Sequence, residues 1–365
     1  MDNTSKLKSI SMLSIVIHSM IGLRLLTLPR DLVSLAGNDA WISVLISGLV
    51  SLIIGYSYYW LGLKYRGLNL SQIAEAVFGK FIGKIILSIF VVYITLAIGL
   101  SIRAFSDSIQ FFLLDTTPSF FIIISMIIAC TYCLINGIKT ISILMDILLP
   151  VILFSIILLV SFSTTNMDRA NLLPVLHTGI MPVLGAYVES IHPFLGLGVM
   201  AYVMPHFSEF KDTKKWIFIG ILIVTFIYIA IVMMCIMVFG SKETEHLIYP
   251  TIILSKSIQF EVQLFERAES FFISSWIPIT FSTMLLFYYS SVLNLKALFN
   301  TNKHNFIVYL HIPVLLLIAL YPKNIVNVYE YLKIPTYLAA GFSIISISMP
   351  VISILKSKKK KNNCI

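Results

Sequence analysis

Two side chains of opposite charge stand beside helix-breaking residues in otherwise apolar parts of the chain. Arg24 follows Gly22 within the apolar stretch 10–30, and Glu189 comes shortly before a Pro and two Gly in the stretch 181–207. A guanidinium binds a carboxylate through two parallel hydrogen bonds, and a carboxylate can hold an ammonium group. Together the two side chains would bind a zwitterion, or they would bind each other and hold two broken helices together.

The stretch 10–30 is long enough to cross a bilayer but contains residues that weaken a helix. Gly22 costs about 1 kcal/mol relative to Ala, and Pro29 lacks a backbone donor and pushes Leu28 towards extended geometry. Free backbone groups at membrane depth are tolerated only where they are buried in protein or line a wet cavity. The alternative is a helix that simply ends at Leu28, with Arg24 extending outward to the interface.

A second interrupted segment has Pro193, Gly196 and Gly198 near mid-depth, which predicts an unwound region facing the first break. Interrupted segments at matching positions of two halves are a sequence sign of a transporter-type site. The candidate ligand-binding residues therefore gather at the two breaks: Gly22, Leu23, Arg24, Thr27, Glu189, His192 and Gly196.

Other polar residues within apolar segments favour structural roles. Arg103 and Asp107 are four residues apart and can pair along one helix face. Asp146 can pair with Lys139 or with a neighbouring helix, and His18 is expected to bond to backbone. The eighth span contains five hydroxyl side chains, at Ser274, Ser275, Thr280, Ser282 and Thr283. We expect them either to line a cavity or to bond back to their own helix.

The composition predicts an all-α integral membrane protein. The 365 residues are 58% hydrophobic and 12% charged, with a mean hydropathy of +0.94, which is more apolar surface than a soluble domain can bury. Ten spans of about twenty residues are expected. They lie near 10–29, 41–63, 82–105, 119–137, 141–162, 180–205, 215–239, 270–293, 305–321 and 335–355.

The net charge of +9 is interpreted as membrane orientation and not as nucleic-acid binding. Lys and Arg concentrate in alternate loops and in the basic tail 356–365, which predicts that both termini face the cytoplasm. Lys6 and Lys8 lead straight into a full-length span, so no cleavable signal is expected. A short amphipathic helix is predicted on the inner surface at 68–80, and a lateral helix on the outer surface at 246–265.

The chain is predicted to form one membrane domain, 1–365, with repeats at about 10–162 and 180–355. The sequence has no phosphate-binding Gly-rich loop, no HExxH and no GxSxG, so we expect no enzyme and no cofactor. Cys130 and Cys133 share a helix face, but no second pair completes a metal site, and no metal is expected.

Residues 21–48, IGLRLLTLPRDLVSLAGNDAWISVLISG, resemble the start of the B subunits of spore-germination nutrient receptors. The similarity is carried by Gly22, Leu26, Leu28-Pro29-Arg30, Ala36-Gly37 and Ala40-Trp41. The segment LFERAESFFISSWI (264–277) resembles the same family through Glu266-Arg267, Glu269 and Trp276, as does the interrupted sixth span. These receptors belong to the amino acid–polyamine–organocation superfamily.

The resemblance implies a LeuT-like fold of five plus five inverted helices, with the first and sixth broken. It also implies a subunit in the inner membrane of a spore that senses a small nutrient, typically an amino acid, together with A and C subunits. The alternatives are a proton- or sodium-coupled amino acid permease and a structural subunit with a vestigial site. One departure stands out, because the superfamily usually has a small residue where this chain has Arg24.

Overall fold

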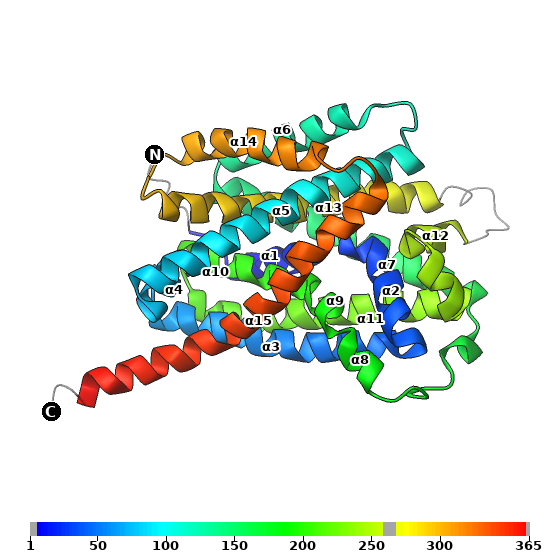
Figure 1. The fold of residues 1–365 in the computed structure, drawn as a ribbon, viewed down its shortest axis with the longest axis horizontal. Coiled ribbons are helices and arrows are strands. Elements are labelled where there is room, and N and C mark those ends of the chain that lie inside the picture. Colours follow the sequence, from blue (N-terminus) through cyan, green and yellow to red (C-terminus); the bar gives the residue numbers. More distant parts are fainter. Residues whose placement is uncertain (1–5, 258–267, 363–365) are drawn as a thin grey trace.

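The computed structural model describes residues 6–257 and 268–362, and the regular elements of these residues are helices (Figure 1). The long ones are α3 (Ala40–Lys64), α5 (Lys80–Phe112), α7 (Ile138–Ser163), α11 (Thr213–His246), α13 (Ala268–Leu298) and α15 (Ile325–Asn362). The shorter ones of seven or more residues are α1 (Ser11–Met20), α2 (Arg24–Ala36), α4 (Leu70–Phe78), α6 (Ser119–Ile135), α12 (Pro250–Lys256) and α14 (His304–Leu320).

Every span predicted from hydropathy coincides with helical structure, although the number of crossings is not established by helix length. Six segments of the described chain are long and apolar enough to cross a membrane, and α1, α6 and α14 are shorter apolar helices. The first predicted span is divided between α1 and α2, because the chain leaves helical geometry at Ile21–Leu23. A count of ten therefore stays a prediction.

The sixth predicted span, 180–205, is not one helix but a chain of short pieces. These are α8 (Met181–Gly185), α9 (Tyr187–Ile191), the 3₁₀-helix η4 (Pro193–Val199) and α10 (Met200–Val203). The predicted unwinding at Pro193, Gly196 and Gly198 is wrong in form, since these residues wind more tightly instead. Pro193 stands at the first position of η4, where a missing N–H costs nothing.

Element boundaries differ from expectation at several other places. The helix predicted at 68–80 is α4, which starts with a capping box between Asn69 and Gln72. Only the part of 246–265 that precedes residue 258 is described, and it contains α12; Glu266 and Arg267 lie outside the described residues. α14 continues through Pro313 to Leu320, and α15 begins at Ile325, before the predicted start of the tenth span.

The first helix lies inside the bundle. α1 contacts α7, α11, α13 and η4, and nine of its ten residues are buried. Figure 1 shows α1 (dark blue) behind α15, which crosses this face of the molecule obliquely. The two segments that carry the breaks therefore meet at the centre, surrounded by the longer helices.

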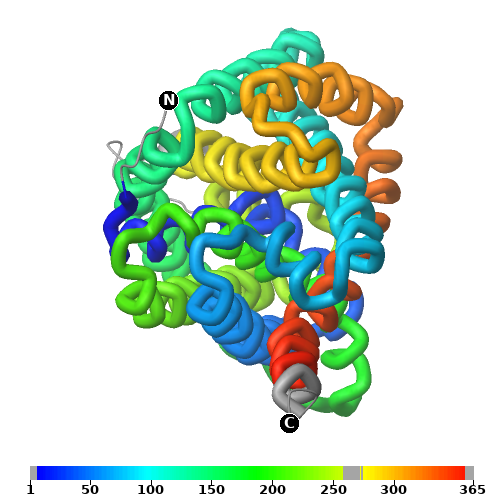
Figure 2. The backbone as a smooth tube through the Cα atoms, turned by 90° about the vertical axis from the view of Figure 1, so that its left-hand side faces the viewer, coloured from blue at the N-terminus to red at the C-terminus, as the bar shows by residue number. Residues whose placement is uncertain are grey.

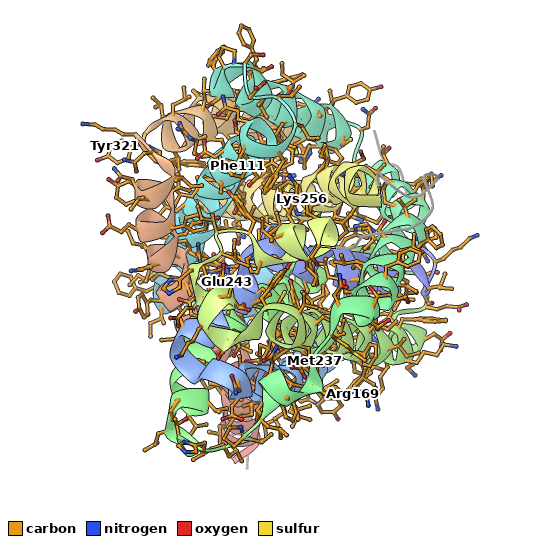
Figure 3. The ribbon with its side chains drawn as sticks, turned by 90° about the vertical axis from the view of Figure 1, so that its right-hand side faces the viewer. Phe111, Arg169, Met237, Glu243, Lys256 and Tyr321 are labelled. Carbon is orange, nitrogen blue, oxygen red and sulfur yellow. The ribbon has the colours of Figure 1, made fainter. Side chains whose placement is uncertain are left out.

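Charged and polar loops gather at two opposite ends. At one end Leu7 donates a backbone hydrogen bond to His206, Tyr59 bonds to the Lys211 carbonyl, and Lys64 bonds to Ser353. Figure 2 looks onto this end, where α15 terminates. Figure 3 looks onto the other end, where Phe111, Lys256 and Tyr321 lie at or next to the C-terminal ends of α5, α12 and α14.

Candidate functional site

The break in the first helix is stabilised by side chains from other helices. α1 ends at Met20, and its last carbonyls have no partner within the helix. The Tyr228 hydroxyl donates to the Met20 carbonyl at 2.8 Å, and the Thr283 hydroxyl lies within hydrogen-bonding distance of the His18 (2.7 Å) and Ile21 carbonyls. A Cβ on Gly22 would lie 2.9 Å from Thr283 Oγ1, so a side chain at Gly22 would displace this hydroxyl.

The helix does not end at Leu28, as the alternative interpretation expected. Pro29 lies within α2, which continues to Ala36. Proline leaves the carbonyl four residues earlier without its helical donor. That carbonyl belongs to Leu25, and the Thr251 hydroxyl of α12 donates to it at 2.6 Å. The hydroxyl replaces the missing backbone donor, and the helix passes through the proline.

Gly196 sets how closely the two broken segments approach. A Cβ on this residue would overlap the backbone carbonyl of Ser19, so only a glycine allows η4 to pack against the end of α1 at this distance. Gly196 is buried at this contact and does not line the neighbouring cavity. The structure therefore brings it to the site as part of the scaffold.

Arg24 begins α2 directly after the break and bonds to four other side chains, one on its own helix and three on other segments. Its Nη1 donates to Asp31 Oδ2 at 2.8 Å and to Glu189 Oε2 at 3.2 Å. Its Nη2 donates to Thr336 Oγ1 of α15 at 2.5 Å, and its Nε to His192 Nδ1 at 3.2 Å. The side chains of Arg24 and Glu189 are 16% and 21% exposed, so the charges are partly buried and compensate each other.

These side chains line a cavity of about 390 Å³ between α2, α9, α13 and α15. The predicted residues Gly22, Leu23, Arg24, Thr27, Glu189 and His192 all contribute to its wall. Apolar walls come from Met20, Phe287 and Leu332. Its volume is in the range of small-molecule sites, which are mostly apolar with a few directed polar groups.

Sequence reasoning missed several residues of this site. Asp31 forms the shortest ion pair of Arg24 and also accepts from Arg30 Nη2 at 2.7 Å. Asp31 is seven residues after Arg24, two helical turns along the same face, but the predicted span ended before it. Tyr329 and Thr336 come from α15, and the Arg30 guanidinium lies 4.6 Å from the centre of the Tyr329 ring. No local sequence signal connects α15 with α2.

The remaining polar candidates have structural partners. Arg103 Nε donates to Asp107 Oδ1 at 2.9 Å, as predicted. His18 bonds to the Met145 carbonyl at 2.9 Å and to Ser282 at 2.6 Å, which confirms the expected backbone bond. Asp146 does not pair with Lys139 among the described contacts. It accepts instead from the hydroxyls of Ser11 and Ser14 on α1, at 2.6 Å each.

The cavity offers both signs of charge next to free backbone donors. The first intrahelical bond of α2 runs from the Leu25 N–H to the Gly22 carbonyl, so the amides before Leu25 have no partner within the helix. Such amides attract anions. Glu189 Oε1 makes no hydrogen bond within the described residues, and the residue lines the cavity. The arrangement suits a small molecule that carries a carboxylate and an ammonium group.

Comparison with known proteins shows that nearly the whole chain is similar to the members of one protein family. A family model described as spore germination protein matches residues 6–328. Spore germination protein A2 of Bacillus subtilis (strain 168) is 30% identical over 308 residues, 84% of each chain. Spore germination protein YndE of the same strain is 30% identical over 302 residues, 81% of this chain and 82% of the relative.

The fold is similar to that of MhsT, solved in complex with L-phenylalanine. The TM-score is 0.74 at 14% sequence identity, over 94% of this chain and 89% of that chain. At this identity the likeness concerns the fold alone, and it confirms the predicted LeuT-like architecture with interrupted first and sixth segments.

Proposed function

This chain belongs to the spore germination protein family, and we propose that it is the membrane-embedded subunit of a spore germinant receptor that senses a small nutrient such as an amino acid. The observation that carries the proposal is the Arg24–Glu189 pair, which lines a cavity at the broken helices of a transporter-like fold. Charges of opposite sign at one cavity match the two ends of a zwitterion.

In the proposed complex the ligand's carboxylate meets Arg24 and the amides of Gly22 and Leu23 at the start of α2. Its ammonium group meets Glu189, and Thr27 and His192 complete the wall. The ligand's carboxylate then competes with Asp31 and Glu189 for the Arg24 guanidinium. A ligand shifts a two-state equilibrium only by its difference in affinity for the two states. When the ligand replaces Asp31 or Glu189 on Arg24, binding changes the contacts between α2 and α9, and this change can favour one of the two states.

We further propose that the chain lies in the inner membrane of the spore with both termini in the cytoplasm, and that it acts with A and C receptor subunits. The asymmetry of Lys and Arg between alternate loops supports the orientation. The subunit partners follow from the family resemblance. The repeats at about 10–162 and 180–355 are proposed on the same basis.

The second candidate is an amino acid permease, and the likeness to MhsT with bound L-phenylalanine favours it. Both functions use the same cavity, but only a permease moves its ligand across the membrane. Uptake of radiolabelled amino acids by vesicles that contain the purified protein separates them. We expect the protein to bind the amino acid without accumulating it inside the vesicles. Uptake that is lost in an Arg24→Ala variant would show that the protein is a permease and contradict the sensor function.

The decisive experiment compares spores with and without this protein across a panel of single amino acids. We expect the deletion to abolish or strongly slow germination with one amino acid or a small group of them, while germination with unrelated triggers continues. A deletion strain that germinates like wild type with every amino acid tested would contradict the proposed function.

A further inference from the structure

A groove of about 810 Å³ lies between α3 and α11 and shares no lining residue with the Arg24 cavity. Its floor is apolar and its rim is basic, with lining residues Leu52, Ile53, Tyr56, Lys211, Asp212, Lys214, Lys215 and Phe218. Ile53 and Tyr56 are 54% and 48% exposed. We propose that this groove binds one anionic phospholipid, with the headgroup phosphate at the lysines and an acyl chain along the apolar floor.

The groove lies beside the contact between the two helices. α3 and α11 pack closely where a Cβ on Gly48 would meet Thr225 and a Cβ on Gly55 would meet Ile221. Lys211 and Asp212 belong to the 3₁₀-helix η6 (Phe210–Asp212), which leads into α11 and stands beside Tyr59 of α3. The groove opens between this turn and the exposed side chains of α3.

Aromatic side chains place the groove at the depth of lipid headgroups. Lys214 Nζ lies 5.7 Å from the centre of the Tyr56 ring, and Lys215 Nζ lies 4.8 Å from that of Trp216. Tyr and Trp concentrate at the membrane–water interface, where one part of the side chain is apolar and the other polar. Ile53 lies about one turn along α3 from Tyr56, on the lipid side of this aromatic level.

The charge of the rim selects the sign of the headgroup. None of the three rim lysines forms an ion pair among the described residues, and Asp212 is the single carboxylate of the groove wall. The rim therefore has an excess of two positive charges. Basic pockets between transmembrane helices attract anionic headgroups, and the apolar floor favours a lipid over a free phosphate ion.

The test measures the melting temperature of the purified full-length protein in detergent during titration with short-chain phosphatidylglycerol. We expect a saturable rise, weaker with phosphatidylcholine and absent with inorganic phosphate, because a ligand that binds the folded state raises its stability. In the variant Lys211→Gln/Lys214→Gln/Lys215→Gln, the phosphatidylglycerol concentration that gives half of the rise should increase by roughly fivefold for each lysine removed.

The matched control is Lys80→Gln/Lys139→Gln/Lys303→Gln, which removes the same charge from exposed sites outside the groove. It should keep the wild-type response. Ile53→Trp fills the floor without changing any charge, and should weaken the response even if the triple groove variant does not fold. The proposal would be overturned if phosphatidylcholine or inorganic phosphate raised the melting temperature as much as phosphatidylglycerol does. It would also be overturned if the control variant lost the response to the same extent as the triple groove variant, or if both groove variants kept the wild-type response.

Discussion

Arg24 is the residue that connects the broken first helix to the rest of the cavity. Its guanidinium bonds to α9 through Glu189, to α15 through Thr336, and to its own helix through Asp31. A partly buried charge is tolerated when such partners compensate its lost hydration. The two carboxylates differ in one respect, since Asp31 also pairs with Arg30, whereas Arg24 is the sole ion-pair partner of Glu189 among the described residues.

The first prediction concerns the Arg24–Glu189 pair. If the pair is structural, Arg24→Ala leaves Glu189 unpaired and should cost roughly 3–5 kcal/mol of stability, and Glu189→Ala should cost less because Arg24 keeps Asp31. The double variant should cost less than the sum of the two. Immunoblots of membrane fractions and denaturant midpoints measure these effects.

A ligand-binding role for the same pair gives a different pattern. Each single variant should then keep its abundance and require a higher germinant concentration in a dose curve. Asp31→Asn serves as a control that changes the Arg24 network without removing either proposed ligand contact. Normal abundance with an unshifted dose curve in both Arg24→Ala and Glu189→Ala would remove these residues from the site.

The second prediction concerns the hydroxyl at the helix break. Thr283→Val keeps the shape of the side chain but removes the hydroxyl that lies within hydrogen-bonding distance of the His18 and Ile21 carbonyls, which should cost about 1–3 kcal/mol because a buried acceptor loses its partner. Thr283→Ser should retain most of the stability. Thermal unfolding of the three proteins measures this, and equal stability of the Val and Ser variants would contradict it.

The sequence was sufficient to bring Arg24, Glu189 and His192 to one site, because charges and helix breakers at membrane depth are informative by themselves. It was not sufficient for Thr336 or Tyr329. Those residues lie in a segment that is distant in the chain, and nothing in their neighbourhood distinguishes them from other polar residues of a span. Their role depends on how α15 packs, which only the folded structure supplies.

At the scale of elements, the two interrupted segments are stabilised in different ways. The first is stabilised by hydroxyls from other helices, with Thr251 compensating Pro29 and Thr283 bonding at the break. The sixth is stabilised by its own 3₁₀ hydrogen bonds in η4 and by backbone packing at Gly196. The helix-breaking Gly and Pro residues predicted both interruptions, but such residues cannot distinguish a 3₁₀-helix from an unwound chain.

The third prediction separates two glycines of η4. Gly196→Ala should disrupt the packing of η4 against α1, because the added methyl group overlaps the Ser19 backbone, which cannot move as a side chain can. Gly198→Ala should be tolerated, since its nearest neighbour would be the Tyr58 hydroxyl at an ordinary 3.6 Å. Detergent-extracted protein is compared by size-exclusion profile and melting temperature; similar behaviour of the two variants would contradict the assigned role of Gly196.

At the scale of the whole molecule, composition alone predicted a polytopic helical membrane protein, and the family resemblance added the LeuT-like arrangement. The number of crossings did not follow from helix length, because broken helices divide their apolar length between short pieces. The orientation rests on loop charges, which are a property of the entire chain.

The fourth prediction tests this orientation by cysteine labelling in a background without the native cysteines. Lys214→Cys and Lys360→Cys should be protected from a membrane-impermeant reagent added outside, whereas Arg169→Cys, at the end shown in Figure 3, should react. Permeabilised membranes provide the control for reactivity. Labelling of Lys214→Cys from the outer face of sealed membranes would reverse the proposed topology.

The Arg24–Thr336 bond connects the cavity to a helix, α15, that extends far beyond it. Thr336 directly follows Pro335, a point where the helix lacks a backbone bond and bends more easily. Beyond it the helix continues for roughly 40 Å, at 1.5 Å per residue, past contacts of Ser346 with Tyr58 and of Ser353 with Lys64. If this part of the helix moves as one rigid body, a tilt of about 5° at Pro335 would displace its far end by roughly 3.5 Å.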